Sequence, residues 1–186
     1  VIAQRAVSQD MDMASRETVG IPCEPPWGDS PCPQPIPRSG NTLRLLLLRH
    51  AKSSWDPPRL SDHDRPLSAR GERASRAMGR TLAAEGVRLD MIVSSSAVRA
   101  RETCRIVLAP LGPEAVITAE LYMASPREML EVLREQGPDV DRMAMVGHNP
   151  GMHDFAVRLC GDGPPTELRR LREKFPTGAL AEIELR

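Results

Sequence analysis

The stretch LRLLLLRHAK, residues 43–52, holds an uninterrupted apolar run that ends in Arg49 and His50. A run without alternating polar residues is typical of a strand buried on both faces of a sheet. Apolar runs and helical patterns alternate along the rest of the chain. We expect strands at 43–48, 90–93, 115–118, 142–146 and 179–185, and helices at 69–86, 97–108, 126–136, 151–160 and 166–174. This order predicts a three-layer α/β fold, with a mainly parallel central sheet, helices on both faces and the C-terminal strand at an edge.

Two later apolar runs end in the same kinds of residue. The stretch MIVSSSAVRARET contains Arg99, and MAMVGHNPG contains His148. Because the carboxyl ends of parallel strands meet at one crevice, we expect these side chains to join Arg49 and His50 there. Two imidazoles and two guanidiniums would form a pocket for a phosphoryl group, with one imidazole placed to attack it. Taken singly, each histidine is equally compatible with a structural role.

Composition excludes several other classes of function. The 186 residues suit one domain, and 25 Lys and Arg balance 25 Asp and Glu, so no global charge attracts nucleic acid or an anionic membrane. Aromatic residues make up only 3 %, which disfavours base stacking on single strands. No apolar stretch approaches the roughly 20 residues that cross a bilayer, and no secretory signal precedes the domain. The four cysteines fit no zinc pattern, so we expect a cytoplasmic, metal-free protein.

Residues 1–42 differ from the rest of the chain. Seven of the 18 prolines lie between Pro22 and Pro37, and periodic apolar residues are absent. Such a segment buries too little apolar surface to offset the entropy of ordering, so we expect a disordered extension before a domain at 43–186. A binding arm is the alternative. A disulfide between Cys23 and Cys32 is possible, whereas Cys104 and Cys160 are expected to be buried thiols.

Six motifs in this order resemble the histidine phosphatase superfamily, and more closely its short SixA-like phosphohistidine phosphatase branch: RHAKSSWD, DRPLSARG, SSSAVRARET, AELYMAS, VGHNPG and KFPTGALAEIEL. The resemblance covers residues 43–186. It implies a phosphoglycerate mutase-like fold and a reaction without a cofactor or metal. Where the wider superfamily has Arg-His-Gly, this chain has Ala51 after His50, as the SixA-like branch tolerates.

The resemblance also implies roles for individual residues. His50 would be the nucleophile that forms a phosphohistidine intermediate, and Arg49 and Arg99 would bind the phosphoryl oxygens together with protonated His148. The pattern S-x-x-x-R-A-x-x-T selects Arg99 over Arg101. Glu120 occupies the position of a general acid, but it could equally activate water or lie at the pocket rim.

The remaining polar residues near these motifs have simpler expected roles. Arg65 and Lys52 are cations between the first strand and first helix, where Asp56, Asp62 and Asp64 could pair with them. We expect His63 and His153 to lie outside the core site.

The substrate is inferred from the family and from chain length. A short chain leaves little room for a lid, and an open site suits phosphohistidine on a protein, such as a histidine phosphotransfer domain. The alternatives are a small-molecule phosphomonoesterase, which would depend on Glu120, and a non-catalytic phosphate-binding adaptor. A mutase would need a closed site, for which the chain is too short.

Overall fold

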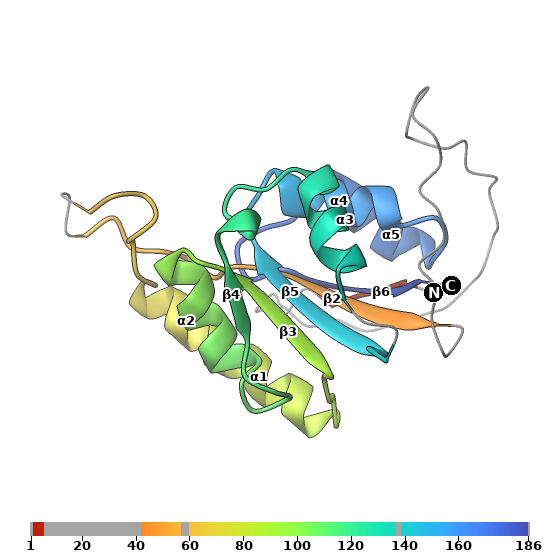
Figure 1. Ribbon diagram of the computed structural model, residues 1–186, viewed down its shortest axis with the longest axis horizontal. Helices are drawn as coiled ribbons and strands as arrows, with labels where there is room; N and C mark the ends of the chain where they lie inside the picture. Colours follow the sequence, from red (N-terminus) through yellow and green to blue (C-terminus); the bar gives the residue numbers. More distant parts are fainter. Residues whose placement is uncertain (1, 6–41, 57–59, 137–138, 186) are drawn as a thin grey trace.

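The computed structural model of the chain describes residues 2–5, 42–56, 60–136 and 139–185. These residues form a six-stranded sheet with the strand order β1-β6-β2-β5-β3-β4 (Figure 1). The strands are β1 (Ile2–Arg5), β2 (Leu43–Arg49), β3 (Met91–Ser95), β4 (Val116–Thr118), β5 (Arg142–Gly147) and β6 (Leu180–Leu185). The helices are α1 (Ala69–Ala84), α2 (Val98–Val107), α3 (Pro126–Arg134), α4 (Gly151–Leu159) and α5 (Pro165–Glu173), with a 3-10 helix η1 (Ala119–Leu121).

The sheet is mainly parallel and is covered on both faces, which confirms the predicted architecture. Strands β2, β5, β3 and β4 are parallel neighbours, whereas β6 runs antiparallel to β2. Helices α1 and α2 lie on one face, and α3, α4 and α5 lie on the other (Figure 1). The leucines of β2 alternate between the two cores. Leu45 and Leu47 pack beneath α3–α5, and Leu46 and Leu48 pack beneath α1 and α2. An apolar run without polar alternation is what this double burial requires.

The outer edge of the sheet beside β6 differs from the expectation. The C-terminal strand β6 was expected at the edge; it pairs with β2, but β1 adds antiparallel to its other side and takes the outermost place. Four residues of the expected disordered extension therefore form a strand. Backbone pairing with a distant strand supplies this order, and the composition of a segment does not reveal such pairing. Cys23 and Cys32 lie outside the described residues.

Helices α1 and α3 begin at serine caps. The Ser68 hydroxyl accepts from the Gly71 N–H at 3.1 Å, and Ser125 forms a capping box with Glu128 ahead of Pro126. Gly86, with φ of 70°, follows the end of α1. Cys104 and Cys160 are buried free thiols, as expected. No helix in the described segments has the length and apolar character needed to span a bilayer.

The registers of the parallel strands determine where the site lies. Arg49 at the end of β2 pairs with Gly147 at the end of β5, and Ser94 of β3 pairs with Val146. The residues that follow these strands, among them His50 and His148, therefore emerge at the same edge of the sheet.

Candidate active site

Three of the four predicted core residues form a contiguous buried cluster at this edge. His50, His148 and Arg99 are only 8 %, 2 % and 3 % exposed. The two imidazole centroids are 5.0 Å apart. Arg99 lies against both rings: its Nε donates to His50 Nε2, and its Nη2 donates to His148 Nδ1, each at 3.3 Å. The predicted convergence of strand ends therefore places two imidazoles and a guanidinium in direct contact.

The His50 ring is held in one tautomer by the backbone. Its Nδ1–H donates to the Ala51 carbonyl at 2.8 Å, which leaves Nε2 without a proton and facing Arg99. Any residue at position 51 supplies this carbonyl, so Ala51 removes no functional group. Burial lowers the pKa of His50 to about 4, and the nearby Arg99 and Arg49 charges act in the same direction. The ring is consequently neutral near pH 7, as a nucleophile must be.

His148 is held by Ser95. The two groups lie 2.8 Å apart, Ser95 Oγ to His148 Nε2. Because His148 Nδ1 accepts from Arg99, the neutral ring carries its proton on Nε2 and donates it to the serine. Burial, then His50 and Arg99, lower the pKa of His148 to about 3. An arriving phosphoryl dianion would favour protonation at Nδ1, which makes both ring nitrogens donors.

Gly147 lies close to the Met152 side chain of α4. A Cβ at position 147 would lie 2.7 Å from Met152 Cε, the flexible end of that side chain, which would have to move.

Arg99 uses both edges of its guanidinium. The edge formed by Nε and Nη2 faces the imidazoles, and the edge formed by Nη1 and Nη2 faces Asp62. Nη1 donates to the Asp62 carbonyl, and Nη2 donates to Asp62 Oδ2 at 2.8 Å. The sequence indicated Asp62 only as a partner of nearby cations, and its contact with Arg99 was not anticipated.

Thr103 connects the beginning of α2 to the end of β2. Its hydroxyl donates to the Arg99 carbonyl at 2.7 Å and accepts from the Ala51 N–H at 3.0 Å. This is the threonine of the S-x-x-x-R-A-x-x-T pattern, so the structure gives that pattern a physical meaning. Arg101 and Arg105 point away from the cluster, as predicted.

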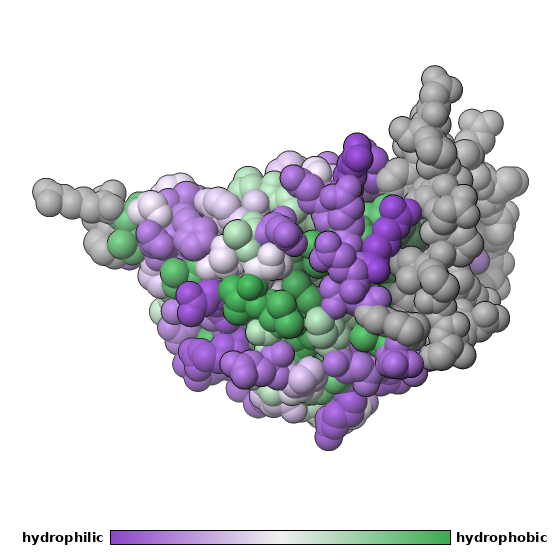
Figure 2. Space-filling view, in the orientation of Figure 1, coloured by the Kyte–Doolittle hydropathy of each residue, from purple (hydrophilic) through white to green (hydrophobic). Residues whose placement is uncertain are grey.

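Arg101 and Arg105 instead line a separate cavity of about 560 Å³ between α2 and β4, which shares no residue with the cluster. Figure 2 shows apolar side chains gathered over the β4 side of the molecule, where Val116 and Ile117 are about half exposed, with charged residues around them.

Arg49 lies beside the cluster and is anchored from a different direction. Its Nη1 donates to the Phe175 carbonyl at 2.7 Å, and the Asn149 amide donates to the same oxygen at 2.9 Å. The Nε of Arg49 is buried and has no hydrogen-bond partner among the described residues. The positive charge of Arg49 lowers the pKa of both His50 and His148, although burial and Arg99 lower these pKa values more. Arg49 is therefore electrostatically part of the site.

Glu120 is not brought into the cluster by any contact of its carboxylate. The residue is exposed on η1, and its backbone N–H donates to the Thr118 hydroxyl at 3.2 Å. Tyr122, two residues further, reaches the site instead: its ring meets His148 edge to face at 5.4 Å, and its hydroxyl donates to Asp62 at 3.0 Å. Alternation through AELY would place Glu120 and Tyr122 on the same side, so the sequence pattern does not single out Tyr122.

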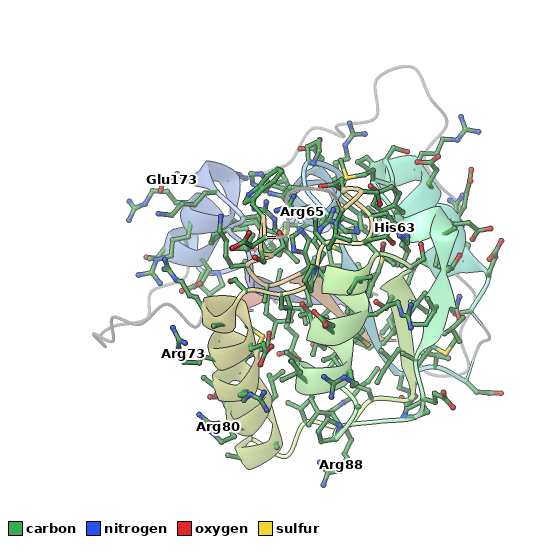
Figure 3. All side chains as sticks on the ribbon, turned by 90° about the vertical axis from the view of Figure 1, so that its left-hand side faces the viewer. His63, Arg65, Arg73, Arg80, Arg88 and Glu173 are labelled. Carbon is green, nitrogen blue, oxygen red and sulfur yellow. The ribbon has the colours of Figure 1, made fainter. Side chains whose placement is uncertain are left out.

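The loop before α1 contributes structural contacts. Arg65 donates to the Ser54 carbonyl, Ser53 and Asp62, and its guanidinium stacks 3.4 Å above the Trp55 ring. These contacts agree with the structural role expected for it. Figure 3 shows Arg65 and His63 on the side of the molecule where α1 and α2 begin, whereas Arg73 and Arg80 lie further along α1.

The other two histidines lie outside the core cluster. His63 contacts Ser96 at 2.9 Å and the edge of the Tyr122 ring, next to the site but without a bond to His50 or His148. His153 bonds the Leu171 carbonyl at 2.5 Å and stacks on Phe175, which is a structural role. Within the described part of the chain, no three His, Cys, Asp or Glu side chains are grouped to hold a metal ion.

Comparison with known proteins agrees with this geometry. The family model of the histidine phosphatase superfamily (branch 1) matches residues 45–122. An uncharacterised protein of Mycobacterium tuberculosis is 35 % identical over 144 residues, which are 74 % of this chain and 87 % of that protein.

Two similar solved structures are those of proteins described as candidate SixA phosphohistidine phosphatases. The one from Nakamurella multipartitia has a TM-score of 0.68 and 27 % identity, covering 78 % of this chain and 86 % of that one. The one from Agrobacterium tumefaciens has a TM-score of 0.66 and 31 % identity, covering 74 % and 89 %. The chain therefore belongs to the histidine phosphatase superfamily, in its SixA-like branch.

Proposed function

We propose that this protein is a phosphatase that uses His50 as its nucleophile and removes the phosphoryl group from phosphohistidine on a protein. The observation that carries the proposal is the state of His50. Its Nδ1–H is engaged by the Ala51 carbonyl, its unprotonated Nε2 accepts only a long hydrogen bond from Arg99 at 3.3 Å, and its lowered pKa keeps the ring neutral. Nε2 faces the guanidinium that would bind the phosphoryl oxygens.

The reaction follows from these positions in two steps. The Nε2 lone pair of His50 attacks phosphorus, and the bond from phosphorus to the substrate nitrogen breaks. The substrate ring carries a proton on its other nitrogen, so it leaves as neutral imidazole. The negative charge on the equatorial oxygens is stabilised by the Nε–Nη2 edge of Arg99, by the unused N–H donors of Arg49 and by His148. Water then attacks the phosphorylated His50, which releases inorganic phosphate and restores the free imidazole. The guanidiniums supply the positive charge, so we expect no metal requirement.

The carboxylates around the site favour a nitrogen leaving group. A phosphate ester needs a proton for its leaving alkoxide, which calls for an acid with a raised pKa. Among the described residues, the carboxylate that contacts the cluster is Asp62. Partial burial acts to raise its pKa, but bonds from Arg99, Tyr122 and Arg65 outweigh this and lower it to about 2. A phosphohistidine ring that is protonated on its other nitrogen leaves as neutral imidazole, whose conjugate acid has a pKa near 6.5, so its departure needs no acid from the protein.

The test compares two substrates. The purified protein is incubated with EDTA and either a histidine-phosphorylated phosphotransfer domain or an aryl phosphate. We expect loss of phosphohistidine, weak aryl phosphate turnover, and a phosphorylated enzyme intermediate that is stable to base and labile to acid. His50→Ala should abolish the intermediate and the turnover.

His153→Gln is the matched control, because that ring lies outside the cluster and glutamine can still donate to the Leu171 carbonyl. Turnover and the intermediate should persist in this variant. Strong aryl phosphate turnover that is lost in Glu120→Gln would instead identify a small-molecule phosphomonoesterase. Phosphate binding without any turnover would identify an adaptor.

A further inference from the structure

We propose that Asp62 is a positioning residue that holds Arg99 so that its Nε–Nη2 edge faces the phosphoryl site. The inference deepens the proposed function, because it concerns the same anion pocket. The Arg99 guanidinium presents one edge to the imidazoles and another to Asp62. Arg99 is 3 % exposed, and without a partner on its outer edge its planar group could rotate about the terminal torsions of the side chain.

Asp62 engages that outer edge at two points. The backbone carbonyl accepts from Nη1 and carboxylate Oδ2 accepts from Nη2, so a single residue matches the fork of the guanidinium. The remaining N–H groups, on Nε and Nη2, point between His50 and His148 at 3.3 Å from each ring nitrogen. These contacts are long for hydrogen bonds and can be exchanged for phosphoryl oxygens.

Asp62 is itself fixed by three neighbours. Arg65 donates to Oδ1 at 2.9 Å, and the Tyr122 hydroxyl donates to Oδ2 at 3.0 Å. The next residue, His63, accepts the Val98 N–H at 3.0 Å through its carbonyl, which ties the segment to the beginning of α2. The carboxylate is thus fixed from the loop, from η1 and from α2, although half of its side chain remains exposed.

A carboxylate on a phosphate-binding arginine can either orient it or compete for it, and the geometry separates the two. Asp62 occupies the Nη1–Nη2 edge, whereas the phosphoryl group would occupy the Nε–Nη2 edge. Both anions can therefore bind Arg99 together. Orientation predicts that removal of the carboxylate weakens oxyanion binding, while competition predicts that removal strengthens it.

Tungstate, a phosphate-like oxyanion, is the probe for calorimetric titration of the full-length protein. Asp62→Ala should weaken its affinity roughly 10- to 100-fold, the cost of a misplaced binding group. Asp62→Asn keeps one oxygen for Arg99 but turns an amide donor toward Arg65, so its affinity should fall less. Asp64→Asn is the control and should bind as the parent does, because that carboxylate contacts Ser61 and His63 in the same loop but not Arg99.

A double-mutant cycle distinguishes positioning from general destabilisation. In an Arg99→Lys background, Asp62→Ala should have little further effect on tungstate affinity, because its partner is already lost. An equal effect in both backgrounds, or tighter binding by Asp62→Ala, would overturn the proposal. Tungstate binding needs no turnover, so a protein that hydrolyses no phosphohistidine would refute the proposed function and leave this test intact.

Discussion

The two guanidiniums of the site are held in opposite ways. Arg99 is buried at the beginning of α2, and both of its edges are engaged, one by the imidazoles and one by Asp62. Arg49 is half-buried at the end of β2, with a single hydrogen bond to the Phe175 carbonyl and a buried Nε that has no partner among the described residues. The Arg99 side of the pocket is therefore organised before substrate arrives. On the Arg49 side, N–H donors remain available for the substrate.

The difference shows how the fold divides the task of binding an anion. On the Arg99 side, Asp62 of the loop fixes the guanidinium and is itself held by the Arg65 and Tyr122 side chains, which reduces the reorganisation needed in the transition state. On the Arg49 side, the backbone of the C-terminal segment gives the support: Gly178 N–H donates to the carbonyls of Arg49 and His50, at 3.2 and 3.1 Å. This is the structural role of the KFPTG motif.

The largest expected effect comes from replacing each arginine by lysine. Arg99→Lys should lower kcat/KM about 10²- to 10³-fold, because an ammonium cannot serve two imidazoles and Asp62 at once. Arg49→Lys should cost only about tenfold, since lysine can still donate to the Phe175 carbonyl and retains the charge. Phosphohistidine turnover measures both variants. Equal losses would mean that the asymmetry has no catalytic consequence.

The stability of the folded protein in acid should depend on His50 and His148, the two buried histidines that contact Arg99. The pKa values of His50 and His148, about 4 and about 3, lie below the unfolded value of about 6.5, so the unfolded chain binds more protons in this range. The free energy of unfolding should fall as the pH drops from about 6.5, by up to about 1.4 kcal/mol per pH unit for each histidine.

Replacing both histidines by asparagine should flatten this slope in urea unfolding between pH 6.5 and 4. His153→Gln, on the Phe175 side, should retain it. An unchanged slope in the double variant would show that other groups account for the acid sensitivity.

A smaller effect is expected when one supporting hydrogen bond is removed on each side of the pocket, from Thr103 on the Arg99 side or from Asn149 on the Arg49 side. Thr103→Val leaves the buried Ala51 N–H unsatisfied, so the free energy of unfolding should fall by about 1–3 kcal/mol. Asn149→Ala removes one bond to Phe175 but also a buried amide oxygen without a partner, so its cost should be smaller. Chemical unfolding of the two variants measures the difference. If Asn149→Ala lost more free energy of unfolding than Thr103→Val, the Arg49 side would be the more rigid one.

The sequence predicts those residues of the site whose positions are determined by the sheet. Parallel strands bring Arg49, His50 and His148 to one edge, and a fixed helical spacing brings Arg99, so these positions follow from short-range patterns. The starts of α1 and α3 follow in the same way, from the cap at Ser68 and from Pro126 in the first turn.

Asp62 and the direction of Glu120 could not be predicted because no periodic element carries them. Asp62 is 37 residues from Arg99 in a loop with two other aspartates, and nothing in the sequence distinguishes the three. The direction of Glu120 depends on the 3-10 turn of η1, which at three residues per turn sends Glu120 and Tyr122 to different sides of the chain. β1 was missed for a related reason, since an edge strand depends on a partner at the other end of the chain.

The smallest expected effect concerns the ring pKa values. Arg99 lowers the pKa of both His50 and His148 more than Arg49 does, although burial is the largest cause in each case. Arg99→Gln should therefore raise both pKa values further than Arg49→Gln, and both should stay below 6.5 because the rings remain buried. Titration of the imidazole resonances by NMR resolves this. If Arg49→Gln gave the larger rise, the charge of Arg49 would have the larger effect on the pKa of the nucleophile, and Arg99 would contribute geometry alone.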